Sequence, residues 1–377
     1  MLSSKQEPLR TVYSPHTTLY TMPQHLDFSD FEATKSHVQR MSFYPIMFQA
    51  ARSLKNLGIL DYMKINRRKR KLTVDEIAEA TNLKPYGVRV LLEAGLSLLL
   101  VETEDQELWT ITPAGRFLLS DRQTEVNFDF VNDVCYEGSL ALEDSIKNHA
   151  PEGLKVFGEW ETIYEALAHL PEDVRKSWFA FDHYYSDGAF PQALKKVFAT
   201  DIKKLADVGG NTGKWSMMCA DHNPDVEITI VDLPGQLNDA MRNVKERGLQ
   251  DRIKAHETNV LRDDVQFPTG MDAFWMSQFL DCFSEKEIVH ILSNAAKVMG
   301  ADTRLFIMET FWDRQSHEAS TYCLHGTSLY FTAMANGNSR MYHSDAMKKC
   351  VEQAGLKVVE DHDQVGDYHT IFECRLA

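Results

Sequence analysis

The amino-acid sequence predicts an α/β protein whose mainly helical amino-terminal region precedes a mostly parallel, doubly wound sheet. From residue 203 onward, short apolar runs alternate with helical segments, which is the pattern of a parallel sheet covered by helices. Earlier in the chain, a helix–turn–helix pattern is followed by two short strands, which is typical of a winged helix. A chain of 377 residues is also long enough for two domains. We therefore expect one domain over 1–122 and a second, beginning with a helical linker, over 123–377.

The amino-terminal domain is predicted from helix boundaries and a hairpin. After a polar, proline-containing arm over 1–30, apolar residues at helical spacing predict a helix that ends near Gly58. Thr73 and Glu76 form a capping box at the start of the next helix. The predicted elements are helices over 43–60, 73–81 and 85–94, and strands over 98–103 and 108–112.

The charge distribution bears on whether this winged helix binds DNA. A DNA-binding motif needs a basic recognition helix, whereas the segment 85–94 carries Arg89 beside Glu93 and little else. The formal net charge of −15 opposes attraction to nucleic acid and to anionic membranes. One basic run, 64–71, is typical of a solvated loop, although it could contact an acidic partner. We therefore expect a packing or dimerisation module, with neither nucleic acid nor a membrane as a partner.

Cysteine usage and the length of the apolar runs indicate the compartment. The six cysteines are scattered without a CxxC pair, which argues against a disulfide framework and against a zinc site. No apolar run approaches the roughly 20 residues of a membrane-spanning helix, and the first residues lack the pattern of a secretory signal. We expect a cytoplasmic protein that binds no metal.

The second domain is predicted from apolar strands that alternate with helices. The last two strands have no helix between them, so the final strand is expected to be antiparallel. The rest of the alternation is that of a doubly wound sheet. The predicted strands are 205–206, 228–231, 273–276, 305–308, 356–360 and 369–375, and the predicted helices are 214–220, 238–247, 286–298 and 344–354.

A glycine-rich loop follows the first of these strands and predicts a cofactor site. It reads acidic-x-Gly-x-x-x-Gly, from Asp207 through Gly209 to Gly213, and its glycines let backbone N–H groups approach a ligand closely. This spacing does not fit GxGxxG, which cradles a pyrophosphate. An acidic group would also repel a pyrophosphate, whereas it suits S-adenosylmethionine, which carries an ammonium and a sulfonium. The loop therefore predicts S-adenosylmethionine as the cofactor.

A second acidic residue, Asp232, ends the next apolar strand. A carboxylate in this place can accept hydrogen bonds from both hydroxyls of a ribose, as in other open α/β nucleotide sites. Leu233, which follows it, would then flank the adenine. The combination of loop and acid favours a cofactor site over a glycine turn without a ligand.

Three short motifs extend this pattern. They are Val231-Asp232-Leu233-Pro234, Phe279-Leu280-Asp281-Cys282-Phe283-Ser284-Glu285 and Gln353-Ala354-Gly355-Leu356. On these residues the chain resembles, over most of its length, the S-adenosylmethionine-dependent O-methyltransferases of the caffeate, hydroxyindole and polyketide-tailoring type. The resemblance implies a Rossmann-like class I methyltransferase domain, a winged-helix dimerisation domain that forms an intertwined homodimer, and a small-molecule substrate.

The resemblance also implies which residues bind the cofactor. Gly209 and Asp232 match the family's loop glycine and ribose-binding acid. Asn259 and Val260 lie where the family has an acid and an apolar residue beside the adenine, and the amide oxygen of Asn259 can still accept a hydrogen bond from the adenine amino group. Ser277 occupies a position that is lysine in many members.

A stretch before the glycine loop is expected to line both cofactor and substrate. Residues 181–186 match the family's Phe-Asn-x-x-Met-Ser, and Tyr185 replaces the methionine. The resemblance implies that Phe181 and Tyr185 contact the substrate and that Ser186 contacts the cofactor.

A predicted helix over 321–333 supplies further candidates. Tyr322, His325 and Leu329 share one of its faces at i, i+3, i+7 spacing. The counterpart helix of the family lines the substrate pocket, so Tyr322 and Leu329 are candidate substrate contacts. His325 is a candidate base, although a histidine on such a face is more often a packed core residue.

The residue at the position of the family's general base departs from the family pattern. Members that methylate phenols carry Leu-His-Asp-Trp-Ser-Asp-Glu, and the gapless match here places Asp281 at the histidine position. Glu309 matches the acid that supports that histidine. A carboxylate of ordinary pKa is poorly matched to a phenol of pKa about 10, but burial or the neighbouring Glu309 would raise the pKa of Asp281. Asp281 as base, His325 as base and a purely structural role for Asp281 stay open.

The sequence thus predicts an enzyme that moves a methyl group from S-adenosylmethionine to a hydroxyl of a small aromatic or polyketide-like molecule. S-Adenosylhomocysteine would be the product of the cofactor. The missing histidine leaves C- or N-methylation within the same family as an alternative. A protein that binds the cofactor without methylating, either a winged-helix regulator or an enzyme of other chemistry, is the remaining alternative.

Overall fold

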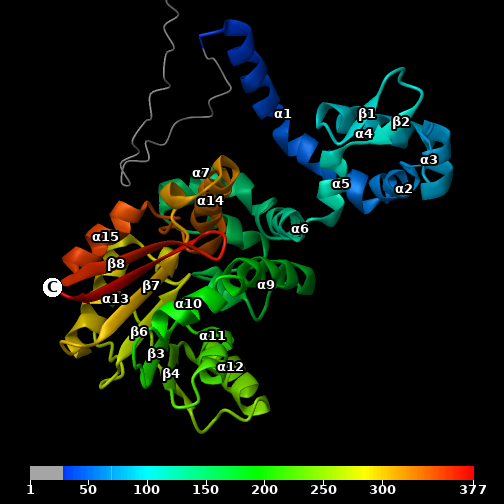
Figure 1. Ribbon diagram of the computed structural model, residues 1–377. Helices are drawn as coiled ribbons and strands as arrows, with labels where there is room; N and C mark the ends of the chain where they lie inside the picture. Colours follow the sequence, from blue (N-terminus) through cyan, green and yellow to red (C-terminus); the bar gives the residue numbers. More distant parts are fainter. Residues whose placement is uncertain (1–28, 69) are drawn as a thin grey trace, which may run out of the picture.

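The parallel strands of the carboxyl-terminal part position the site. The computed structural model describes residues 29–68 and 70–377, so the predicted arm up to residue 28 and Lys69 of the basic run lie outside the described residues. Figure 1 shows a small helical module on one side of a larger part that contains a twisted sheet. The predicted fold class, a mostly parallel sheet behind a helical amino-terminal module, is confirmed.

The seven-stranded sheet has the order β5-β4-β3-β6-β7-β9-β8. Strands β3 to β7 pair in parallel, whereas β9 is antiparallel to both β7 and β8, as the missing crossover helix predicts. Strand β3 lies between β4 and β6, so the direction of winding reverses there. The strands are β3 (Lys204–Val208), β4 (Glu227–Asp232), β5 (Ile253–Glu257), β6 (Ala273–Ser277), β7 (Arg304–Glu309), β8 (Leu356–Val365) and β9 (His369–Leu376).

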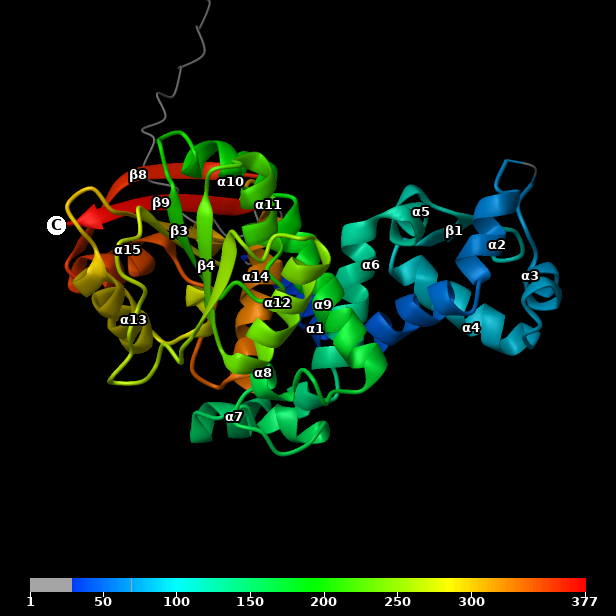
Figure 2. The same ribbon diagram turned by 90° about the horizontal axis from the view of Figure 1, so that it is seen from below.

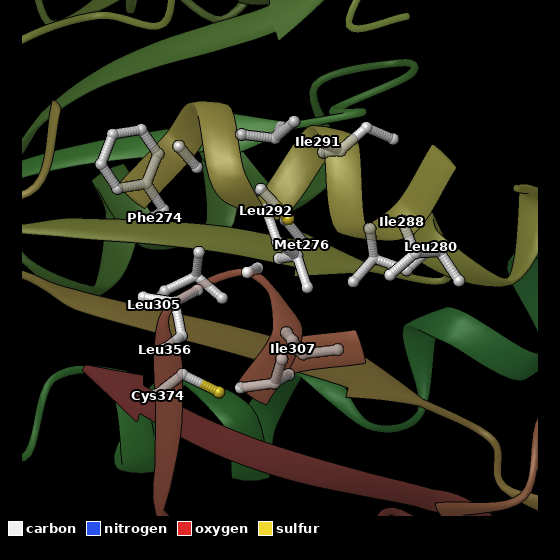
Figure 3. Close-up of a cluster of buried hydrophobic side chains, with 14 of the residues drawn as sticks. Phe274, Met276, Leu280, Ile288, Ile291, Leu292, Leu305, Ile307, Leu356 and Cys374 are labelled. Carbon is white, nitrogen blue, oxygen red and sulfur yellow. The ribbon is translucent and has the colours of Figure 1, made fainter. Parts of the chain in front are cut away.

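Helices cover both faces of this sheet because alternate residues of each strand point to opposite sides. Phe274 and Leu305 pack under the helices of one face, and Figure 3 shows them with Ile291 and Leu292. Trp275 and Phe306, the next residues along the same strands, pack into the core of the other face. The first face is covered by α13 (Glu285–Val298) and α15 (Ser344–Gln353), and the second by α10 (Phe190–Val197), α11 (Lys214–His222) and α12 (Pro234–Glu246).

The amino-terminal module has its own core and stands to one side of the sheet in both views (Figures 1 and 2). The predicted capping box is present: Thr73 Oγ1 accepts a hydrogen bond from the Glu76 N–H, and the Glu76 carboxylate accepts one from the Thr73 N–H. The elements are α1 (Phe31–Asn56), α2 (Ile59–Asn66), α3 (Val74–Thr81), α4 (Pro85–Ser97), β1 (Val101–Thr103), β2 (Trp109–Ile111) and α5 (Pro113–Ser120). Among the described residues, no helix is both long and apolar enough to span a membrane.

A third group of helices packs around a separate aromatic core between the module and the sheet. Segments distant in sequence meet here, since Trp178 and Tyr330 share this core and bond to each other. The elements are α6 (Arg122–Asp129), η1 (Phe130–Cys135), α7 (Leu142–Asn148), α8 (Ile163–Ala166), α9 (Glu172–Asp187), α14 (Glu318–Tyr330) and η6 (Phe331–Ala335). These helices form the wall that faces the carboxyl ends of the parallel strands.

Candidate active site

A cavity of about 1010 Å³ lies where the loops after the parallel strands meet the helical wall. Its lining includes residues of the loop after β3, the end of β4, the turn after β6, and the helices α9 and α14. This is the crevice in which open α/β sheets bind ligands, because strand order reverses at β3. The size suits a cofactor together with a small substrate.

The glycine loop forms the floor of one end of the cavity. Gly209 has φ +74°, and a Cβ there would lie 2.3 Å from a ring carbon of Phe279, so no larger residue fits without displacing that ring. Its N–H donates to the Val231 carbonyl over 2.9 Å, which ties the loop to β4. Gly213, with φ +76°, is the N-cap of α11 and is not among the described residues that line the cavity.

Asp207 lies beneath this loop, not in its mouth. Its carboxylate is buried, accepts a hydrogen bond from Ser216 Oγ over 2.6 Å, and is not among the described residues that line the cavity. The expectation of direct cofactor contact therefore does not match the structure, because the side chain of a residue inside the strand points into the core between sheet and α11. Burial raises the pKa of Asp207 to about 7.

Asp232 stands at the end of β4 and faces the cavity. Its two carboxylate oxygens accept hydrogen bonds from the N–H groups of Asn211 (2.9 Å) and Leu233 (2.7 Å). Each oxygen retains a lone pair, so the carboxylate can accept two further hydrogen bonds from a ribose. Leu233 also lines the cavity, as the sequence predicts for a residue beside an adenine.

The remaining predicted cofactor residues divide into two groups. Asn259 and Val260 line the cavity, although Asn259 Oδ1 already accepts a hydrogen bond from the Leu261 N–H over 2.9 Å. Ser277 and Ser186 are not among the described residues that line it. The Ser277 hydroxyl is buried without a described partner, and the Ser186 hydroxyl bonds Asp187 over 3.5 Å. The structure therefore brings neither serine to the cavity wall.

Asp281 reaches the cavity from η4 (Leu280–Cys282), the turn that follows β6. Its side chain is buried, with 6% of the residue exposed, and its carboxylate accepts a hydrogen bond from the Cys282 thiol over 3.5 Å. Burial raises the pKa of Asp281 to about 6, while the contacts with Cys282 oppose that rise. This shift moves the carboxylate toward the range of a general base that works near neutral pH.

Glu309 holds this turn in place from the end of β7. One of its carboxylate oxygens accepts hydrogen bonds from the N–H groups of Phe279 (3.1 Å) and Leu280 (2.9 Å). Its other oxygen is buried without a described partner. Burial, and then the charge of Asp281, raise the pKa of Glu309 well above its usual range. Glu309 is not among the described residues that line the cavity, so it meets the turn that carries Asp281 from behind the cavity wall.

Aromatic side chains form the other end of the cavity. Phe181 stacks on Phe130 with ring centroids 3.9 Å apart, and Tyr330 meets Phe130 edge-on at 4.9 Å. Tyr330 is fixed by a hydrogen bond of 2.7 Å from the indole N–H of Trp178. These four side chains line an apolar compartment of the kind that holds a planar ligand.

The other predicted substrate contacts lie around this compartment. Tyr185 lines the cavity, and its hydroxyl donates to Asn127 Oδ1 (2.9 Å) and accepts from the Gln123 amide (3.2 Å). Tyr322 and Leu329 also contribute to the lining, but they are 71% and 52% exposed, so they lie at its rim.

The histidine candidate is not brought to the site. His325 is not among the described residues that line the cavity, and its ring packs edge-on against Trp312 at 5.2 Å. The helical spacing that joins it to Tyr322 and Leu329 leaves it on the side of α14 that packs against the turn after β7. The structure therefore leaves Asp281 as the predicted base that reaches the cavity.

Sequence reasoning missed a second carboxylate in the cavity, Asp182. It lies on α9 next to Phe181 and lines the cavity. Burial raises the pKa of Asp182 to about 6, with the charge of His183 opposing and that of Asp281 adding to the rise. The signal was present in the sequence, because Asp182 stands where the resembling family has asparagine.

Comparisons with known proteins agree with this geometry. The chain matches the family model of the O-methyltransferase domain over residues 141–357, and that of a Dimerisation2-like domain over residues 36–108. These matches confirm the resemblance proposed from the sequence. They place the catalytic family model over the parallel strands β3 to β7 and the dimerisation model over the helical module.

Three individual proteins illustrate the similarity. The chain is 22% identical over 300 residues to L-tyrosine C(3)-methyltransferase of Streptomyces lavendulae, covering 79% of this chain and 81% of that protein. It is 24% identical over 270 residues to demethylspheroidene O-methyltransferase of Cereibacter sphaeroides, covering 71% and 69%. It aligns with the structure of an O-methyltransferase (NcsB1) from neocarzinostatin biosynthesis, in complex with S-adenosylmethionine and 2-hydroxy-5-methyl naphthoic acid, with a TM-score of 0.62, 19% identity, and 88% and 96% coverage.

Replacing Asp232 with alanine is expected to weaken the binding of S-adenosylhomocysteine. Loss of two charge-assisted hydrogen bonds to the ribose corresponds to about 100-fold or more in affinity. Isothermal titration calorimetry measures this directly. The control is Asp239→Ala, which removes an exposed acid of the following helix. Unchanged affinity in Asp232→Ala would contradict the assignment of Asp232 to the ribose.

The buried Asp207 is expected to make stability depend on pH. Its pKa is about 7 in the folded protein and near 3.8 in the unfolded chain, so the folded state binds the proton more tightly. Its contribution to stability is therefore complete below the unfolded value and is lost as the pH rises through about 7. Urea unfolding should show Asp207→Asn gaining stability relative to the wild type between acidic and mildly alkaline pH. A stability difference that does not vary with pH would contradict the shift.

Proposed function

The chain belongs to the O-methyltransferase family, and on this basis we propose that it methylates a hydroxyl of a small aromatic molecule held in the cavity. One observation carries the proposal: a single cavity joins the glycine loop and the carboxylate of Asp232 to the buried carboxylate of Asp281 and an aromatic compartment. The cofactor is S-adenosylmethionine, which when bound supplies an electrophilic methyl group on a positively charged sulfur.

The cofactor end of the cavity fits this group. Glycine at position 209 lets the loop pack directly against the ring of Phe279, because any Cβ there would overlap that ring. Asp232 offers free lone pairs for the ribose hydroxyls, and Leu233 and Val260 provide apolar contact for the adenine. We propose that these residues, with Asn259, hold the cofactor.

Asp281 is the proposed general base. An in-line displacement needs a nucleophile that is held near contact distance and deprotonated at the right moment. The Asp281 carboxylate would accept the proton of the substrate hydroxyl. A phenol has a pKa of about 10, so a base of pKa near 4 is a poor match, and the buried Asp281 at about 6 is a better one.

Glu309 supports this base through the backbone. Its carboxylate binds the two N–H groups that precede Asp281, which fixes the turn and therefore the direction of the Asp281 side chain. It does so without touching the substrate. Phe181, Tyr185, Tyr322 and Leu329 are proposed to contact the aromatic ring from the walls and rim of the cavity.

A second candidate is transfer to a ring carbon. It is favoured by the absence of the histidine typical of phenol O-methylation and by the similarity to L-tyrosine C(3)-methyltransferase. The same carboxylate would serve both reactions, because removal of the phenol proton also makes the ring carbons beside the hydroxyl nucleophilic. After transfer to carbon, the methylated ring carbon loses its hydrogen as a proton and the oxygen regains one, which restores the aromatic phenol. The orientation of the ring toward the cofactor then decides which atom is methylated.

The helical module is proposed to form a homodimer. Large apolar side chains on α1 are exposed in the single chain, among them Phe31 (73%), Phe43 (57%) and Ile46 (66%). An exposed apolar stripe of this kind marks an interface. The match of residues 36–108 to a Dimerisation2-like domain supports a second copy of the chain as the partner.

A cytoplasmic location is also proposed. All six cysteines are free, and Cys323 is exposed, which suits a reducing compartment.

Replacing Asp281, the proposed base, should remove most of the turnover, and the wild-type rate should depend on the protonation of Asp281. With Asp281→Asn, kcat is expected to fall about 100-fold or more, while the affinity for S-adenosylhomocysteine stays unchanged. In the wild type, kcat/KM should rise with pH through about 6, because the protonated carboxyl cannot accept a proton. The control is Asp251→Asn, an exposed acid before β5. Full turnover in Asp281→Asn would show that Asp281 is not the base.

The same assay locates the methyl group. S-Adenosylmethionine with a deuterated methyl and a panel of simple phenols would be incubated with the enzyme, and the product examined by nuclear magnetic resonance. Label on oxygen is expected. Label on a ring carbon would favour the second candidate, and release of no methylated product from any phenol would contradict the proposed substrate class.

The homodimer predicts a particle of twice the 43.1 kDa chain mass in light scattering after size exclusion. Ile46→Asp should shift the particle toward the monomer, because burial of a charge in an apolar interface is costly. The control is Val359→Asp on the edge strand β8, also an exposed apolar residue. A wild-type monomer would contradict the proposed interface.

A further inference from the structure

The acidic side chains in the wall of the cavity are not balanced by basic ones. Among the described residues that line it, no lysine or arginine occurs, whereas carboxylates occur along its whole length. A ligand that enters the cavity therefore meets negative potential from several directions. The lining carboxylates are those of Asp121, Glu165, Asp182, Asp232, Asp281 and Glu287.

Four of these carboxylates either accept hydrogen bonds that stabilise the fold or are exposed to solvent. Asp121 caps α6 by accepting hydrogen bonds from the N–H and hydroxyl of Thr124, and Glu287 completes the capping box of α13. Asp232 is held by backbone N–H groups at the cofactor end, and Glu165 is exposed.

Asp182 and Asp281 are different. Asp182 has no hydrogen bond or ion pair to any described residue, although it lines the cavity. Asp281 is 6% exposed, and its hydrogen-bond donors are the weak thiol of Cys282 and backbone N–H groups of its own turn, with no cation among them. Repulsion from the charge of Asp281 contributes to the raised pKa of Asp182. Asp281 is buried and Asp182 is half-buried, and carboxylates withdrawn from water without a cation are costly, so a bound cation would relieve that cost.

The helix α9 presents Asp182 together with aromatic rings. Trp178, Phe181, Asp182 and Tyr185 are spaced at i, i+3, i+4 and i+7, so they share one face of α9, and all four line the cavity. Phe130 and Tyr330 complete the compartment around them. Aromatic faces beside a carboxylate attract an organic cation, because the ring quadrupole adds to the charge.

We propose that the substrate of this enzyme is a protonated aromatic amine, whose ammonium group is bound by Asp182 against the aromatic face of α9. This inference rests on the proposed methyl transfer and adds the substrate class. Asp281, which lines the same cavity, remains free to accept the hydroxyl proton. The ammonium also favours the ionised form of Asp281, so that substrate binding keeps the base charged. Aromatic acids are excluded by repulsion from the same two carboxylates.

The test uses three probes that share a phenol ring and differ in the charge of the side chain: tyramine, 4-ethylphenol and 3-(4-hydroxyphenyl)propionate. Each is titrated calorimetrically into the full chain saturated with S-adenosylhomocysteine. Tyramine is expected to bind about 10- to 100-fold more tightly than 4-ethylphenol, since a hydrogen-bonded charge pair is gained. The propionate should bind more weakly than either.

Asp182→Asn separates this role from cofactor binding. The variant should bind tyramine and 4-ethylphenol with similar affinity, while its affinity for S-adenosylhomocysteine stays unchanged. Asp173→Asn, an exposed acid in the first turn of the same helix, is the matched control and should retain the preference for tyramine.

Several outcomes would overturn the proposal. They are equal affinities of the wild type for tyramine and 4-ethylphenol, tighter binding of the propionate, or no tyramine binding by a protein that still binds S-adenosylhomocysteine. If Asp182→Asn weakens the binding of S-adenosylhomocysteine and S-adenosylmethionine but not of tyramine, the carboxylate serves the ammonium of the cofactor instead. Failure to bind S-adenosylhomocysteine at all would count against the proposed function itself, which makes the two failures distinguishable.

Discussion

The hydrogen bonds from the turn after β6 to the carboxylate of Glu309 set the geometry of both ends of the site. They fix Phe279, whose ring fills the space beside Gly209 and so determines that the cofactor loop must lack a side chain there. They also fix Leu280, and through it the direction in which Asp281 enters the cavity. One buried acid at the end of β7 thus links the ring beside Gly209 to the position of Asp281, although Glu309 is not among the described residues that line the cavity.

The fold was predictable because it depends on patterns that are local in sequence. Alternating apolar strands and amphipathic helices indicate a doubly wound sheet, and the missing helix before the last strand indicates its antiparallel direction. The capping box at Thr73 marks a helix start that the structure shows at the expected residue. The position of the cavity follows in turn, since the reversal of strand order at β3 creates the crevice. Asp232, at the end of a strand, was predicted to face this crevice for the same reason, and it lines the cavity.

Side-chain direction was less predictable, because it depends on packing between distant segments. Asp207 is one residue from the end of β3, and the alternation of the strand turns it under the loop toward Ser216. His325 shares helical spacing with two residues of the cavity, yet packing against Trp312 takes its ring elsewhere. Asp182 was overlooked because the acid gains significance only when α9 and the turn that carries Asp281 come to line the same cavity. No single stretch of sequence contains both carboxylates.

If Asp281 is the base, as proposed, its replacement of the family's histidine changes the charge of the site as well as the identity of the base. A histidine base is neutral before it accepts a proton and positive afterwards, whereas a carboxylate base is negative before and neutral afterwards. In a cavity whose described lining has no lysine or arginine, the negative base is tolerable only if its charge is partly suppressed or is matched by a cation. Burial accomplishes the first by raising the pKa, and an ammonium on the substrate would accomplish the second. A carboxylate base therefore favours a positively charged substrate. Asp182 strengthens this preference, because it adds a second negative charge to the compartment.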